Sequence, residues 1–194
     1  MPNLARFALI ALATLAAIML AGCFTSKTSL YEGVTPLRPF RDGAVFTSVT
    51  NGKTEHTTAH EVSPGVYHFV SDDSSGKDPD DPYRFFPLPN APAGILVEEV
   101  KTEVSCPSSG PSSGTAATCP IYIYGLWRMT PKGVEVANPD CSKIKGVAQL
   151  PGVEVDNSGN GSNCGFTRRA TLEQALRMAA AAHLKPDNVV TVRQ

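Results

Sequence analysis

The stretch IYIYGLW, Ile121 to Trp127, is the clearest strand signal in the chain. β-branched and aromatic residues fill it, and these residue types favour an extended backbone packed in a sheet. Alternate residues of a strand share a face. One face would therefore carry Ile121, Ile123, Gly125 and Trp127, and the other Tyr122, Tyr124 and Leu126, with Gly125 as a candidate bulge.

Two interpretations of these apolar faces remain open. The strand can be buried on both sides under a covering helix, which is where large apolar side chains are usually found. Alternatively, Tyr122, Tyr124 and Trp127 form an exposed aromatic ligand face for a partner or a glycan.

Further strand signals lie on both sides of this stretch. Downstream, GVEVA at 133–137 is expected to pair with it across a turn at 130–133. Upstream, Asn51-Gly52 separates two β-prone runs within 44–59, and an Asn-Gly pair in that position is a strong hairpin signal. The remaining expected strands are VYHFV at 66–70, YRFFPL at 83–88, GILVEEVKTEV at 94–104 and, as a possible last strand, NVVTV at 188–192.

One helix is expected near the C-terminus. Thr171 and Gln174 have the spacing of a capping box, and LEQALRMAAAAHL at 172–184 places apolar residues at helical intervals on one side. Pro186 ends the pattern. The sequence therefore predicts a mainly β fold, a β-rich α+β domain. Its antiparallel sheet would have about six to nine short strands, with the C-terminal helix packed on or beside it.

The N-terminus has the pattern of an export signal. Arg6 precedes an almost uninterrupted apolar run from Phe7 to Leu20, and this run is short for a membrane-spanning helix. It ends in LAGC, Leu20 to Cys23, which resembles the lipobox of bacterial lipoproteins. The resemblance implies cleavage between Gly22 and Cys23, a covalent diacylglyceryl group on the Cys23 thiol and an N-acyl lipid on its new amino terminus. An uncleaved anchor helix, or an ordinary secretory signal with a chance cysteine, is the alternative.

The lipobox resemblance sets the expected domains and address. Residues 1–22 would be the signal peptide, residues 23–41 the lipidated Cys23 and a tether on which Tyr31, Leu37 and Phe40 could dock, and residues 42–194 a single β-rich globular domain. Two or more acyl chains make a stable anchor. No aspartate follows Cys23, and this leans toward the outer membrane of a two-membrane bacterium over the inner one.

The other cysteines are expected to form disulfides. Cys106, Cys119, Cys141 and Cys164 are an even number in a chain expected to be exported, where the surroundings are oxidising. Pairing of neighbours, Cys106 with Cys119 and Cys141 with Cys164, would close two loops rich in turn residues. No two of the four lie within four residues of each other, so the usual spacing of zinc ligands is missing and no metal is expected.

Charge and motifs narrow the possible functions. The 194-residue chain carries 17 basic and 18 acidic side chains, without the basic excess of a nucleic-acid binder. Neither a G-x-S-x-G nucleophile motif nor a phosphate-binding loop is present, so no catalytic residue is assigned. His56 and His60 are four residues apart, but on a strand they would lie about 13 Å apart. His68 and His183 are interpreted as structural residues and not as catalytic ones. The acidic run from Asp72 to Asp81 lacks the order of calcium ligands that an EF-hand requires.

Three functions remain at this level. The first is an envelope lipoprotein facing the periplasm, with a structural, adaptor or binding role, no cofactor beyond its lipid and an envelope protein as its partner. The second is a module that binds a small molecule or glycan. The third is an enzyme whose site no local motif reveals.

Overall fold

In a computed structural model of the chain, the structure describes residues 23–50, 53–72, 81–92, 94–105, 118–131, 133–156, 163–182 and 188–193. Strands dominate these residues, as the sequence predicts. The strands are β1 (Phe24–Ser26), β2 (Ala44–Thr50), β3 (Lys53–Ser63), β4 (Val66–Ser71), β5 (Tyr83–Pro87), β6 (Ile95–Ser105), β7 (Thr118–Thr130), β8 (Gly133–Ala137), β9 (Val153–Asp156), β10 (Asn163–Phe166) and β11 (Asn188–Arg193). The helices are α2 (Arg169–Ala181) and two short 3-10 turns, η1 (Cys141–Lys143) and η2 (Val147–Gln149).

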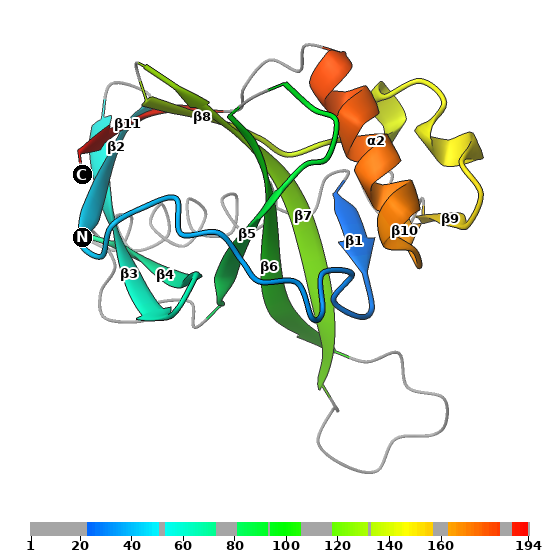
Figure 1. The fold of residues 1–194 in the computed structure, drawn as a ribbon, viewed down its shortest axis with the longest axis horizontal. Helices are drawn as coiled ribbons and strands as arrows, with labels where there is room; N and C mark the ends of the chain where they lie inside the picture. Colours follow the sequence, from blue (N-terminus) through cyan, green and yellow to red (C-terminus); the bar gives the residue numbers. More distant parts are fainter. Residues whose placement is uncertain are drawn as a thin grey trace, which may run out of the picture.

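Eight of the strands close into a barrel (Figure 1). Strands β2 to β8 follow one another around it in chain order, all antiparallel, and β11 completes the ring between β8 and β2. The longest ladder joins β6 to β7 from the pair Ile95 and Arg128 to the pair Ser105 and Thr118. Closure leaves none of these eight strands as a sheet edge, which protects the backbone from pairing with other chains.

Aromatic side chains fill the barrel interior. Phe40 lies among them, with its ring centroid 4.9 Å from that of Phe46, 5.4 Å from Phe85 and 5.5 Å from Trp127. It belongs to the strap, residues 27–43, which runs from β1 in front of the ring of strands to β2 (Figure 1). The Tyr67 hydroxyl donates to the Phe40 carbonyl at 2.9 Å. Phe40 therefore plugs the barrel and fixes the strap to it.

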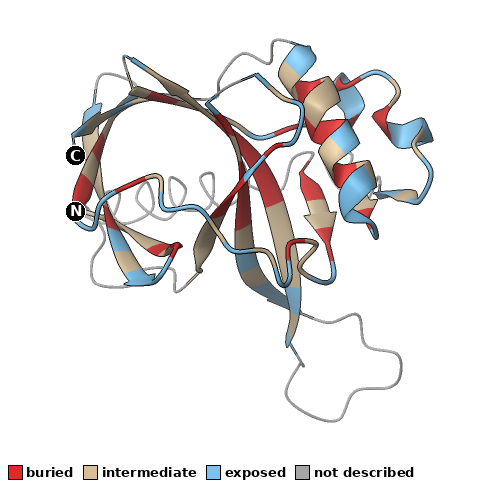
Figure 2. Ribbon diagram, viewed as in Figure 1, coloured by how far each residue is buried: buried red, intermediate tan, exposed pale blue. Residues whose placement is uncertain are grey.

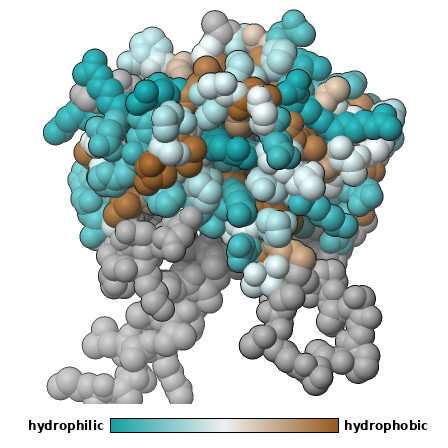
Figure 3. Space-filling model, turned by 60° about the horizontal axis from the view of Figure 1, so that its bottom comes forward, coloured by the Kyte–Doolittle hydropathy of each residue, from teal (hydrophilic) through white to brown (hydrophobic). Residues whose placement is uncertain are grey.

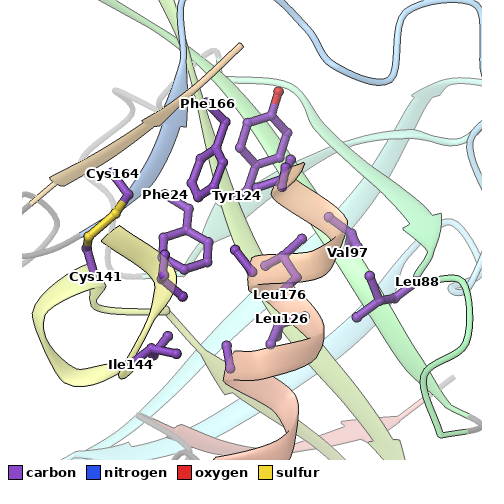
Figure 4. Packing of buried hydrophobic residues seen from close by; sticks show 14 of the residues in the cluster. Phe24, Leu88, Val97, Tyr124, Leu126, Cys141, Ile144, Cys164, Phe166 and Leu176 are labelled. Atoms are coloured by element: carbon purple, nitrogen blue, oxygen red, sulfur yellow. A yellow bond between two sulfur atoms is a disulfide. The ribbon is translucent and has the colours of Figure 1, made fainter. Parts of the chain in front are cut away.

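A second core lies outside the barrel wall. Strand β1 pairs antiparallel with the first half of β7 and parallel with β10, and β9 extends this sheet beyond β10. Helix α2 lies beside it, and Figure 2 shows the buried side of the helix turned toward the strands. The residues of this outer core include Phe24, Phe86, Val97, Tyr124, Leu126, Ile144, Val147, Phe166, Leu172 and Leu176, several of which Figure 4 shows packed together.

Most sequence predictions about the elements are confirmed. Strands β2 and β3 form the expected hairpin, with Thr50 opposite Lys53, although Asn51 and Gly52 lie outside the described residues. Strands β7 and β8 pair across Thr130 and Gly133. The ladder between β6 and β7 is continuous through Gly125, so the bulge expected there is absent.

Two sequence expectations are wrong, one about residues 24–41 and the other about the start of α2. Residues 24–41 do not form a tether, because Phe24, Tyr31 and Phe40 are buried and β1 is part of the sheet, so this segment belongs to the folded domain. Thr171 does not cap α2 either. Arg168 is the N-cap residue, with extended backbone and no side-chain cap, and the Thr171 hydroxyl donates to the Pro151 carbonyl at 3.3 Å.

Candidate functional site

Cys23, the residue expected to carry lipid, is built into the sheet. Its backbone N–H donates to Asn163 Oδ1 at 3.0 Å, and its carbonyl accepts from the backbone N–H of Cys164 at 3.1 Å. Cys23 is only 9% exposed, and Phe24 follows it with no exposure. Strand β1 then pairs on both sides, with β7 and with β10. Any group attached to Cys23 is therefore held directly at the wall of the domain.

The disulfide between Cys141 and Cys164 is confirmed, and it lies next to this strand (Figure 4). It joins η1 to β10, and both cysteines are buried in the outer core. The bridge therefore fixes the strand that holds Cys23. Cys119 is also disulfide-bonded, whereas Cys106 lies outside the described residues.

A buried ion pair lies on the outer face of the barrel wall. Arg84 of β5 and Glu99 of β6 are opposite one another in the ladder, and the Arg84 guanidinium Nη2 donates to Glu99 Oε1. Glu99 is fully buried, while the Arg84 side chain is 28% exposed. Ser29 of the strap donates to both carboxylate oxygens at 3.0–3.1 Å and accepts from Arg84 Nη2 at 3.0 Å. A buried carboxylate requires this kind of compensation.

Aromatic contacts hold the same pair in place. The Arg84 guanidinium carbon lies 5.8 Å from the centroid of the Phe86 ring. The Tyr31 ring stacks on the same Phe86 ring, with the two ring centroids 4.3 Å apart. The Tyr124 hydroxyl accepts the backbone N–H of Leu30 at 3.0 Å. Burial raises the pKa of the Tyr124 phenol, and the negative charge of Glu99 raises it further.

A pocket of about 290 Å³ opens beside this network. The charged residues Lys27, Glu32 and Arg84 line it, together with Ser29, Pro120 and Tyr122. The strap supplies one side of the pocket, and β5 and β7 supply the other. Arg84 therefore connects the buried ion pair to solvent-filled space.

The barrel interior holds a second buried carboxylate. Glu98 is 7% exposed and lies opposite Gly125, where a Cβ atom would come within 2.5 Å of Glu98 Oε2. Gly125 therefore leaves the space that the carboxylate occupies. Burial raises the pKa of Glu98 to about 7, and the nearby indole of Trp127 opposes the rise. The Trp127 N–H is buried and has no hydrogen-bond partner of good geometry among the described residues.

The aromatic residues proposed as a ligand face do not share a surface. Trp127 packs inside the barrel, and Tyr124 is buried in the outer core on the opposite side of β7. Only Tyr122 is partly exposed, as a wall of the pocket. Among the described residues, the large exposed apolar side chains Leu37, Val49, Val62, Val104 and Val155 lie on five separate elements. Figure 3 shows apolar areas scattered among polar ones on the face that it presents.

His56 and His60 lie on β3 and His68 lies on β4, as expected. His56 Nδ1 is 3.0 Å from Thr47 Oγ1, and His60 pairs across the ladder with His68. His60 Nδ1 is also 3.7 Å from Asp42 Oδ1. His183 and residues 73–80 of the acidic loop lie outside the described residues. In the described part of the chain, no three His, Cys, Asp or Glu side chains gather closely enough to hold a metal ion.

The sequence analysis missed Arg84, Glu99 and Ser29. A signal for Glu99 was present, because Glu98 and Glu99 are adjacent within the apolar strand GILVEEVKTEV and must point to opposite faces. If both faces are covered, each carboxylate needs a partner or a raised pKa. The identity of the partner depends on the pairing of β5 with β6, which the pattern alone does not specify.

Comparisons with known proteins found no match. No protein family model, no curated protein and no solved structure matches the chain. Within the described ranges, the structure contains no helix with the length and apolar character that a membrane crossing requires.

Proposed function

We propose that this protein is a lipid-anchored envelope lipoprotein that faces the periplasm and has a binding or adaptor role without catalysis. The position of Cys23 is the observation that carries the proposal. The residue that matches the lipobox cysteine is buried beside β1, and its backbone is hydrogen-bonded to Asn163 and Cys164 of β10. A lipid on Cys23 would hold the barrel directly against the membrane, with no tether between them.

The backbone contacts of Cys23 are compatible with lipidation. An acylated cysteine nitrogen is an amide and retains one N–H, which is the group that donates to Asn163 Oδ1. The carbonyl that accepts from Cys164 is unchanged by cleavage before Cys23. The sheet contacts of β1 can therefore persist in the mature, acylated protein, and a rigid attachment would orient the domain on the membrane surface.

The substitution Cys23→Ala tests this proposal. We expect it to leave an uncleaved, unlipidated precursor, because no thiol remains to accept the diacylglyceryl group. Intact mass and membrane fractionation measure the outcome, with Thr25→Ala as the control that leaves LAGC intact. A Cys23→Ala protein that matures to the wild-type mass and partitions identically with membranes would contradict the lipoprotein assignment.

Partner recovery separates an adaptor from a small-molecule module. The tagged protein is crosslinked in cells, solubilised in mild detergent and analysed by mass spectrometry. One envelope protein recovered near one-to-one supports the adaptor role. The pocket beside the strap favours the second role, because charged and polar side chains converge in it.

A further inference from the structure

Arg84 presents an unused side of a fixed guanidinium to the pocket. Its Nη2 is engaged by Glu99 and Ser29, and its plane lies over Phe86. Among the described residues, no hydrogen bond is made by Nε or Nη1. A guanidinium has five donors in a rigid fork that matches carboxylate and phosphate groups. Because the buried partners fix Arg84, it would bind such a group with little further loss of conformational freedom.

Two opposite charges line the same pocket. Lys27 and Glu32 are both exposed, and in the described part of the chain neither of them forms an ion pair, with each other or with another residue. Both come from the strap, five residues apart, and the half-buried Ser29 and the buried Tyr31 anchor the strap between them. The pocket therefore offers Lys27 and Glu32, which form no ion pair among the described residues, and the side of the Arg84 guanidinium that Glu99 and Ser29 leave open.

We infer that this pocket binds a small zwitterion, with the anionic group of the ligand on Arg84 and Lys27 and its ammonium group near Glu32. The inference rests on the binding role proposed above but not on the lipid anchor. A volume of about 290 Å³ is at the lower end of the range for ligand pockets, which suits an amino acid or a lipid headgroup rather than a larger molecule. Glu32 disfavours a simple dianion, because it would repel the second charge.

A zwitterion of this kind can come from two sources that share the chemistry. One is a free amino acid, which joins a carboxylate to an ammonium group. The other is a phosphoethanolamine headgroup, which joins a phosphate to an ammonium group. The half-buried ring of Tyr122 forms a wall of the pocket and can cover the ligand in either case. The two sources differ in the anionic group, so titration with separate probes distinguishes them.

The test uses the mature full-length protein in detergent and isothermal titration calorimetry. The probes are an amino-acid mixture and then its members, glycerophosphoethanolamine, ethanolamine as the cation alone and acetate as the anion alone. We expect saturable binding of a zwitterion and much weaker binding of either half alone. Tighter binding of glycerophosphoethanolamine, whose phosphodiester carries a single negative charge, assigns the headgroup, and tighter binding of an amino acid assigns the free zwitterion.

Two exposed variants locate the site without disturbing the core. Lys27→Ala and Glu32→Gln should each weaken binding of the zwitterion about tenfold, because each removes a charge-assisted contact. Glu32→Gln should not weaken acetate binding, because the carboxylate of Glu32 repels an anion. Thr25→Ala is the control outside the pocket. Absence of binding by every zwitterion, or binding that neither variant weakens, overturns the inference, whereas membrane fractionation of the same preparations reports separately on the lipid anchor.

Discussion

The barrel interior and the outer core are built from different kinds of contact. The interior is formed mostly by strands β2 to β8, each of which pairs with the next one along the chain. The outer core joins segments from both ends of the protein, and the hydrogen bond from Cys23 to Asn163 spans 140 residues. Local pairing requires less loop closure than distant pairing. The disulfide between Cys141 and Cys164 lies in the outer core, where the entropy cost of closing long loops is largest.

Strand β6 forms part of the wall between the two cores, and its two buried glutamates are stabilised in different ways. Glu98 and Glu99 are neighbours on β6, and one faces the barrel interior while the other faces the outer core. Glu99 is compensated by Arg84 and Ser29. Glu98 has the Trp127 indole nearby but pairs with no cation among the described residues, and burial raises the pKa of its carboxyl to about 7. A buried carboxylate can therefore be retained by an ion pair on one side of a sheet and by protonation on the other.

The largest effect is expected from Phe40→Ala, which removes the plug from the barrel interior. Phe40 is 3% exposed and its ring meets those of Phe46, Phe85 and Trp127. We expect the free energy of unfolding to fall by about 3–5 kcal/mol, from the lost burial and the cavity left behind. Urea denaturation measures it.

Leu37→Ala is the matched control on the same strap, because Leu37 is 37% exposed. It should cost less than about 1 kcal/mol. Equal effects of the two substitutions would mean that the strap lies on the barrel without plugging it. The barrel interior would then be formed by the strands alone, without a contribution from the strap.

A smaller, pH-dependent effect is expected from Glu98→Gln. A carboxyl with a normal pKa of 4.5 in the unfolded chain and about 7 in the fold makes the wild type lose stability as pH rises from about 4.5 to 7, and the loss is complete above 7. This amounts to roughly 3 kcal/mol. Glu98→Gln should therefore flatten the stability profile and make the variant more stable than wild type at pH 8.

Thermal unfolding at pH 5 and pH 8 checks this expectation. Glu103→Gln on the same strand is the control, because Glu103 is exposed. A wild-type protein that is equally stable at both values of pH would show that the Glu98 carboxylate is compensated, and the contrast with Glu99 would disappear.

Much of the barrel could be predicted from the sequence because its information is local. Runs of β-branched and aromatic residues mark β4, β5 and β7, and an Asn-Gly pair marks the hairpin between β2 and β3. Closure could not be predicted, since nothing in NVVTV indicates that β11 fits between β8 and β2. The outer core could not be predicted either, because it also depends on pairing between segments that are distant in the sequence. The segment FTS has no periodicity of its own, and β1 becomes a strand only because β7 and β10 are present on either side of it.

The candidate site was even less visible than the fold. Cys23 and its motif are local in sequence, and so is the pairing of Cys141 with its neighbour Cys164. The pocket depends on the strap lying against β5 and β7, which brings Lys27 and Glu32 to Arg84. Aromatic composition was misleading at Tyr124 and Trp127, because alternation places them in two different cores rather than on one exposed face.

The smallest effect is expected from Thr171→Ala in α2. Loss of an N-cap residue usually costs about 1 kcal/mol. Thr171 instead lies inside the first turn and donates to the Pro151 carbonyl on the surface, so Ala should change stability by no more than about 0.5 kcal/mol in either direction. Leu172→Ala is the contrast, since Leu172 is fully buried in the outer core and should cost about 2–5 kcal/mol.

Urea denaturation of the two variants tests how α2 is held. The helix has no side-chain cap, and its buried residues Leu172, Ala175, Leu176 and Ala179 face the outer core. A large loss for Leu172→Ala with almost none for Thr171→Ala means that packing, not the local start signal, places the helix. A loss of about 1 kcal/mol or more for Thr171→Ala would restore the capping role that the sequence indicates, and part of the outer core would then be as locally encoded as the barrel.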